Sequence, residues 1–251
     1  MRPTDVDYDE AISASYEQGR GLSADAVATW RRAIEVHIPD HGAIVDVGAG
    51  TGRFARELDT VAPHRVVAVE PSAGMRSSAP HSPGSRVSWL AGSAEALPLA
   101  GTSAGLVWSA FTTHYFDLVA AATEFSRVLR PHGRALIWHA FPDVFDDLEW
   151  FRWFPAARAI DENRMPSAAS VRQAFESAGF KFLGRSVHQM RVADNLAALA
   201  DRLAHRSIST LTLISDDEFA EGLTALRNEA SRPNRNQPVF TPNVLLTFVA
   251  P

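Results

Sequence analysis

The chain has 251 residues, of which 46% are apolar and 21% charged, and its formal net charge is −5, as is typical of a folded globular protein. It contains no cysteine, which excludes disulfides, cysteine nucleophiles and zinc sites with Cys ligands. Its basic residues are scattered and no apolar run reaches the roughly 20 residues that span a bilayer. We therefore expect no nucleic-acid or membrane partner. The acidic N-terminal segment lacks the pattern of a signal peptide, which predicts a cytoplasmic location.

The N-terminal and central parts of the chain show two kinds of apolar periodicity. Residues 5–37 are predicted to be helical, with Trp30, Ile34 and Ile38 on one side. Short β-branched runs then alternate with helical stretches, which is typical of βαβ units and a parallel sheet. The expected strands are 43–47, 66–70, 87–91, 106–110 and 135–139, and the expected helices are 53–61, 72–78 and 118–129. A tight turn at residues 131–133 leads into the fifth strand.

The C-terminal part begins with an insertion that mixes aromatic and acidic residues over 142–165. Its rings either line a flat apolar pocket or pack against the helices that follow. Beyond it we expect a helix at 168–178, a strand at 180–190, two helices between 193 and 230, and a strand at 239–250.

A glycine loop follows the first predicted strand. Gly48, Gly50 and Gly52 alternate with other residues and precede a helix that starts at Arg53. Glycine permits positive φ and close approach of a ligand to the backbone, and the helix adds N–H groups that have no partner within the helix. The dinucleotide fingerprint G-x-G-x-x-G would place its third glycine at position 53, where this chain has Arg53. A ligand-binding loop is therefore predicted, with a plain tight turn as the alternative.

Glu70 ends the second predicted strand. A carboxylate only accepts hydrogen bonds, so it is suited to binding both hydroxyls of an adenosine ribose. Enzymes that use NAD place an acid at a similar distance, so Glu70 does not by itself identify the cofactor. The alternative is an exposed acid at the end of a strand.

The segments VDVGAGTGRFA, VVAVEPSAGMR, AGSAEALPL, THYFD and RVLRPHGRALI resemble successive motifs of the class I S-adenosylmethionine-dependent methyltransferases, in the group that acts mostly on small molecules. The resemblance covers about residues 40–141. It implies a Rossmann-like, doubly wound α/β fold with seven strands, mostly parallel and with one antiparallel strand near the C-terminus. It also implies one methyltransferase domain over 1–251, with a helical cap at 5–37, a cofactor-binding core at 40–141, and lid segments at 142–165 and 193–230.

The resemblance further implies S-adenosylmethionine as cofactor and a small-molecule methyl acceptor. The residues that it assigns to cofactor binding are Tyr16, Arg20, Asp46, Gly48, Ala49, Gly50, Thr51, Gly52, Glu70, Pro71, Ser72, Met75, Ser93, Ala94, Glu95, Ser109, Ala110, Phe111 and His114. Ser93 departs from the family, which usually has Asp at that position to accept from the adenine amino group. Packing is an equal alternative for Met75 and Ala94, and a solvated helix face for Arg20.

Two histidines follow predicted strands at the edge of the sheet where ligands bind, His114 after the fourth and His139 at the end of the fifth. Methyl transfer needs mainly orientation, and it needs a base only when the acceptor arrives protonated. Both histidines are catalytic candidates. In related proteins the stretch around His114 flanks the cofactor, so His139 is the better base, with Asp143 placed to orient it. Packing is the alternative for both, and no metal-ligand spacing occurs.

Two other classes of protein stay open. A nicotinamide-dependent oxidoreductase is disfavoured by Arg53 and by the lack of a Tyr-x-x-x-Lys pair, since Lys181 is the only lysine. A non-catalytic module that binds S-adenosylmethionine would keep the same loop. The methylated atom (oxygen, nitrogen or carbon), the acceptor and the oligomeric state are also left open.

Overall fold

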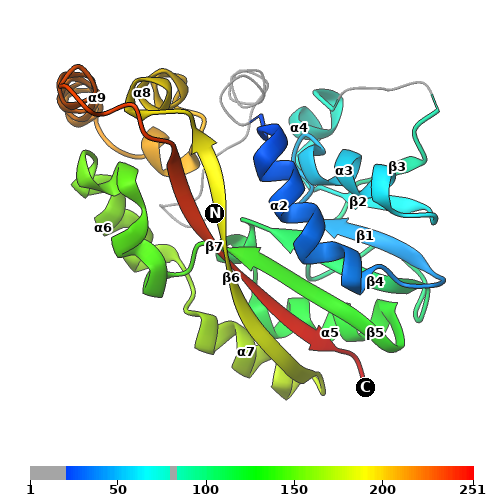
Figure 1. The fold of residues 1–251 in the computed structure, drawn as a ribbon. Coiled ribbons are helices and arrows are strands. Elements are labelled where there is room, and N and C mark those ends of the chain that lie inside the picture. Colours follow the sequence, from blue (N-terminus) through cyan, green and yellow to red (C-terminus); the bar gives the residue numbers. More distant parts are fainter. Residues whose placement is uncertain (1–20, 80–83) are drawn as a thin grey trace.

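The computed structural model describes residues 21–79 and 84–251. Its centre is a seven-stranded sheet in the order β3-β2-β1-β4-β5-β7-β6 (Figure 1). The strands are β1 (Ala43–Val47), β2 (Val66–Val69), β3 (Val87–Leu90), β4 (Ala104–Ala110), β5 (Leu129–His139), β6 (Lys181–Ala193) and β7 (Val239–Val249). The first five pair in parallel, and β7 runs antiparallel to both of its neighbours. This confirms the predicted fold class, including its one antiparallel strand.

Helices cover both faces of the sheet. The α-helices are α2 (Ala24–Ile34), α3 (Arg53–Val61), α4 (Ala73–Ser77), α5 (Leu118–Val128), α6 (Pro155–Arg164), α7 (Ala168–Ser177), α8 (Leu196–Ala204) and α9 (Asp216–Ala230). The 3₁₀ helices are η1 (Glu35–His37), η2 (Thr113–Tyr115), η3 (Pro142–Asp147), η4 (Glu149–Arg152) and η5 (Ser209–Thr212). Figure 1 shows α2 in front of the sheet, α5 and α7 behind it, and α6, α8 and α9 gathered beyond one end of β6 and β7.

Alternation along the strands divides the core between the two faces of the sheet. Ile44 of β1 packs with residues of α2 and α3, whereas Val45 packs on the face that α5 and α7 cover. On the first face Trp30 meets Trp108 edge-on at 5.8 Å between ring centroids, and Phe54 lies 5.4 Å from Trp108. These contacts anchor α3, which begins at the glycine loop, against the sheet.

The fifth strand and the N-terminal helix differ from their predicted bounds. The tight turn at residues 131–133 lies inside β5, which already starts at Leu129, and His132 has φ +64°. The pairing of β5 with β4 jumps from Ala104↔Leu129 to Leu106↔Arg134, so the turn is accommodated as an irregularity in the strand. In the predicted helix 5–37, α2 ends at Ile34 and a 3₁₀ turn follows, while residues 5–20 lie outside the described part.

Within residues 21–79 and 84–251, none of the helices has the length and apolar character that crossing a membrane requires.

Candidate active site

A cavity of about 830 Å³ opens beyond the carboxyl ends of the parallel strands. Gly48 follows β1, Glu70 follows β2, Phe111 follows β4 and His139 ends β5, and all four line the cavity. In doubly wound sheets this is the edge where ligands bind, because the loops that leave the strands meet there.

The glycine loop needs glycine for two physical reasons. Gly48, Gly50 and Gly52 all have positive φ, at +72°, +58° and +85°, a region that other residues rarely adopt. A Cβ on Gly48 would also lie 2.6 Å from the Thr112 side chain. The Gly48 and Ala49 N–H groups both donate to the Val69 carbonyl, which fixes the loop against β2.

Glu70 holds this loop and faces the cavity. Its Oε2 accepts from the Gly50 N–H and its Oε1 from the Ser72 N–H, each at 2.9 Å. Burial raises the pKa of this carboxyl, and the two N–H bonds and the charge of Arg76 oppose that rise. Each carboxylate oxygen can accept a second hydrogen bond, so Glu70 can bind two ribose hydroxyls while it keeps the loop in place.

Asp46 lies behind the loop and outside the cavity wall, with 2% of its surface exposed. Burial, followed by the negative charge of Glu70, raises the pKa of Asp46 to about 7, against the opposing effects of Arg53 and the Ala55 N–H. Its Oδ2 has no hydrogen-bond partner among the residues that the structure describes. A buried acceptor of this kind favours a cation nearby.

The adenine side of the predicted site is also assembled at the cavity, which Pro71, Ser72, Met75, Ser93, Ala94 and Glu95 line. Ser72 caps α4 by accepting from the Met75 N–H, and Glu95 accepts from the Asp117 N–H at the start of α5. Six predicted residues lie behind the wall: Asp46, Ala49, Thr51, Gly52, Ser109 and Ala110. Tyr16 and Arg20 lie outside the described residues.

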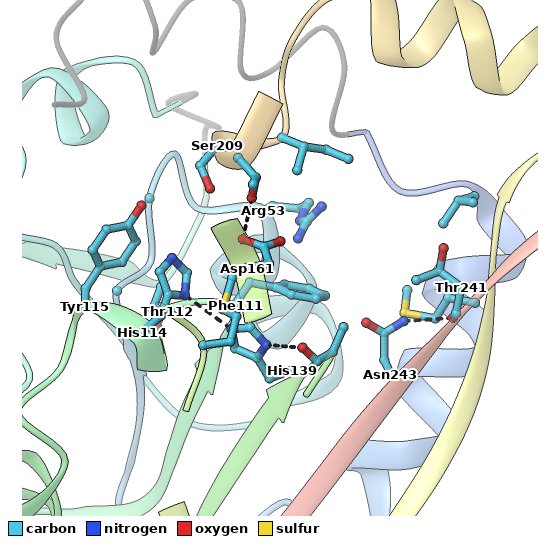
Figure 2. A pocket seen from close by; sticks show the side chains of 18 of the residues that line it. Arg53, Phe111, Thr112, His114, Tyr115, His139, Asp161, Ser209, Thr241 and Asn243 are labelled. Atoms are coloured by element: carbon cyan, nitrogen blue, oxygen red, sulfur yellow. Dashed lines mark hydrogen bonds between the residues drawn. The ribbon is translucent and has the colours of Figure 1, made fainter. Parts of the chain in front are cut away.

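His114 and His139 meet in the wall of the cavity (Figure 2). His139 Nδ1 lies 2.9 Å from the Ala140 carbonyl oxygen, which only accepts, so this nitrogen carries a proton. A neutral His139 therefore accepts at Nε2, and His114 Nδ1 donates to it across 3.3 Å. In this pair of neutral tautomers, the deprotonated nitrogen of His114 is Nε2.

Phe111 holds the histidine pair in place from the sheet. It has φ +60°, a strained conformation for a bulky residue, and its N–H donates to the Trp138 carbonyl at 2.9 Å. Its ring stacks on Phe54 at 6.3 Å and contacts His139 at 5.8 Å. Backbone strain of this kind persists where the surroundings fix it, and it is common at functional sites.

The aromatic insertion divides between both predicted roles. Phe145, Trp150 and Phe151 line the cavity. Trp153 and Phe154 are buried against α9, where a Cβ on Gly222 would collide with both. Rings of the insertion therefore form part of the cavity wall and part of the core.

The predicted link from Asp143 to His139 is wrong. Asp143 is half exposed and forms an ion pair with Arg185 of β6. The sequence could not show this, because β6 lies far from the insertion in sequence and reaches it only in the folded sheet. The Ala140 carbonyl accepts from His139 instead.

Several polar residues at the far end of the cavity were not predicted. Arg164 of α6 donates to Asp161, to Ser209 at 3.0 Å and to Thr210 at 2.8 Å. Thr241 and Asn243 reach the cavity from the first residues of β7 (Figure 2). No spacing could have identified them, since they come from three separate segments. Across residues 21–79 and 84–251, no group of three or more His, Asp or Glu side chains is arranged to hold a metal ion.

Comparison with known proteins agrees with this geometry. Residues 45–137 match the family model described as a methyltransferase domain. A curated relative, the malonyl-[acyl-carrier protein] O-methyltransferase of Dechloromonas aromatica, is 33% identical over 179 residues, which are 67% of this chain and 64% of that protein. The matched part spans only from 33% to 65% of the length of the curated relatives compared.

Solved structures share the fold. One is a protein of Anabaena variabilis assigned as a methyltransferase of an antibiotic biosynthesis pathway, with a TM-score of 0.68, 21% identity, and coverage of 89% of this chain and 99% of that one. Another is phosphoethanolamine N-methyltransferase 2 of Haemonchus contortus, solved with phosphomonomethylethanolamine and S-adenosylhomocysteine. Its TM-score is 0.64 and its identity 16%, and the match covers 100% of this chain and 59% of that one.

The fold and the glycine-loop site are those of the class I methyltransferases. Residues 45–137 match the methyltransferase domain, and a curated methyltransferase is 33% identical over 67% of the chain. The chain therefore belongs to the S-adenosylmethionine-dependent members of this class, and its cofactor is S-adenosylmethionine. The residues present fit that molecule. Gly50 leaves open space at the loop, and the Glu70 carboxylate, which lines the cavity, suits a ribose.

Proposed function

We propose that this chain transfers a methyl group from S-adenosylmethionine to a small-molecule acceptor bound at the far end of the cavity. The observation that carries the proposal is the convergence of the glycine loop, Glu70 and the histidine pair on one cavity. When bound, the cofactor supplies an activated methyl group, which leaves sulfur as the acceptor atom bonds to it. The relatives named above methylate oxygen in one case and nitrogen in the other, so the methylated atom stays open.

In this proposal the residues of the chain bind the cofactor and the acceptor, orient them, and exclude water. The glycine loop, Glu70 and the residues that line the adenine side hold the cofactor. The segments 142–165 and 193–230 act as a lid, because Trp150 from the first and Leu199 from the second both line the cavity. Displacement at an activated carbon gains most from such positioning.

We assign the base to His114 and a positioning role to His139. The sequence favours His139 as the base, but in the structure its Nδ1 donates to the Ala140 carbonyl and its Nε2 accepts from His114. His114 Nε2 is then the nitrogen that takes a proton from an acceptor hydroxyl or ammonium group. His139 orients the ring and stabilises the charge that forms on it.

Calorimetry tests the cofactor half of this proposal. We expect S-adenosylhomocysteine to bind and NADH to give no heat. Tight NADH binding would instead favour an oxidoreductase. Release of S-adenosylhomocysteine during incubation with a panel of phenols, amines and carboxylic acids separates an enzyme from a binding module.

Substitutions test the two histidines in the same assay. The wild-type rate should rise with pH as the base loses its proton. His114→Ala should lose this rise and lower kcat by roughly 10²–10⁴, with a much smaller effect on the cofactor dissociation constant. His139→Gln keeps an acceptor near the position of Nε2, so it should retain more activity than His139→Ala. Equal loss in these two variants, or a normal rate in His114→Ala, contradicts the assignment.

A further inference from the structure

Arg164 is a buried cation in the wall of the cavity, at the end away from the glycine loop. Its side chain is only 6% exposed. Nε donates to Asp161 at 2.8 Å, and Nη2 donates to Ser209 and Thr210. Nη1, with two N–H groups, has no hydrogen-bond partner among the described residues.

A buried donor without a partner costs free energy, and the cost is larger when the group is charged. Asp161 neutralises the charge of Arg164 through Nε, but it does not reach Nη1, whose two N–H groups have no acceptor among the described residues. Evolution usually removes such a group unless a ligand satisfies it, and guanidinium groups suit oxyanions because their N–H bonds are planar and always charged.

Two further arginines line the same cavity as Arg164. Arg191 and Arg202 line the same end of the cavity, where the acidic residues are Asp161 and Glu149. Arg202 donates to the carbonyl of Val192. Arg191 is already paired with Asp25 and Asp194, whereas Arg164 Nη1 has no hydrogen-bond partner among the described residues.

We propose that the acceptor carries a carboxylate and that Arg164 Nη1 binds it. This inference rests on the proposed function and names the class of substrate. A carboxylate held by guanidinium N–H groups is a weaker nucleophile, since its lone pairs are engaged. The methylated atom is therefore a different atom of the acceptor, and the carboxylate fixes its orientation and selects acids over neutral analogues.

Matched pairs of probes test the charge directly, with the wild-type protein loaded with S-adenosylhomocysteine. The pairs are 4-hydroxybenzoate with 4-hydroxybenzamide, and octanoate with octanamide, which suit the aromatic and the aliphatic parts of the wall. Calorimetry measures binding. We expect the acid of at least one pair to bind at least tenfold more tightly than its amide.

The variants separate Arg164 from the general charge of the protein. Asp161→Asn/Arg164→Gln removes both charges, so neither is left buried and unpaired, and it should reduce the preference to less than twofold. Arg164→Lys keeps the charge and should keep part of the preference. Arg158→Gln is the matched control, since Arg158 is exposed on the same helix and pairs with Asp146 and Glu162, and it should behave like wild type.

Two results overturn the inference: no preference for the acid in either pair of the wild-type protein, including absence of binding, or an unchanged preference in the double variant. If the double variant fails to fold, the preference of the wild-type protein for the acid over the amide still tests the inference. Failure of S-adenosylhomocysteine to bind is a separate outcome, and it rejects the proposed function itself.

Discussion

Replacing Asp46 by Asn tests how strongly the glycine loop buries a carboxyl group. Burial and the charge of Glu70 raise the pKa of Asp46 to about 7 in the folded protein, whereas an Asp in an unfolded chain titrates near ~3.9. Between these values the unfolded chain has released the proton and the folded chain still holds it. The contribution of Asp46 to stability is therefore fully present below about pH 4 and is lost as the pH rises to about 7.

The size of this loss follows from the interval between the two pKa values. The two pKa values differ by about three units, and each unit corresponds to ~1.36 kcal/mol. The loss of stability therefore has an upper limit of about 4 kcal/mol. Relaxation around the charged carboxylate reduces this, so we expect a loss of roughly 1–3 kcal/mol. Asp46→Asn has no proton to release at this site. It should therefore gain stability relative to wild type by that amount between about pH 4 and about pH 8.

Urea unfolding of both proteins across this range measures the difference in the free energy of unfolding. Other titrating groups are common to both proteins and largely cancel. Asp147→Asn is the control, because Asp147 is exposed on η3, and its difference from wild type should stay flat. A flat difference for Asp46→Asn as well would refute the argument, since it would mean that the carboxyl titrates alike in the folded and unfolded chains.

Two further predictions concern the cofactor side of the cavity. Glu70→Ala should raise the dissociation constant of S-adenosylhomocysteine by roughly 30- to 150-fold, equivalent to about 2–3 kcal/mol of charge-assisted hydrogen bonds. Glu57→Ala should leave the constant unchanged, because Glu57 pairs with Arg31 and does not line the cavity. An unchanged constant in both variants, measured by calorimetry, would remove Glu70 from the site. Gly48→Ala should destabilise the protein by more than the ~1–2 kcal/mol of a positive φ alone, because its Cβ would lie 2.6 Å from Thr112. Thermal unfolding should show a smaller effect for Gly50→Ala, which meets no atom within 4 Å, and equal effects would argue against the clash.

The cofactor half of the site was predictable because it is local in sequence. Each parallel strand is short and apolar and is followed at once by the residue that faces the ligand, as with Val47 and Gly48 or Val69 and Glu70. The order of the strands in the sheet then brings these residues together without further information. The same logic correctly placed His139 at the cavity.

The acceptor half was not predictable, because tertiary packing assembles it. Arg164, Ser209 and Asn243 meet the same cavity from α6, η5 and β7, and nothing in their spacing relates them. The direction of the hydrogen bond between His114 and His139 depends on where the Ala140 carbonyl points, which is a property of the folded backbone. The predicted contact between Asp143 and His139 is wrong for the same reason, since the partner of Asp143, Arg185, lies on a strand distant in sequence.

The position of β7 in the sheet determines the order in which parts of this protein can fold during synthesis. The strand lies between β5 and β6, and among the described strands β6 pairs only with β7. The sheet therefore stays incomplete during synthesis until the ribosome has passed Val249. Chains fold as their segments emerge, and the glycine loop with its flanking strands emerges far earlier. Thr241 and Asn243 arrive with β7, so a nascent chain acquires its cofactor loop first and its acceptor wall last.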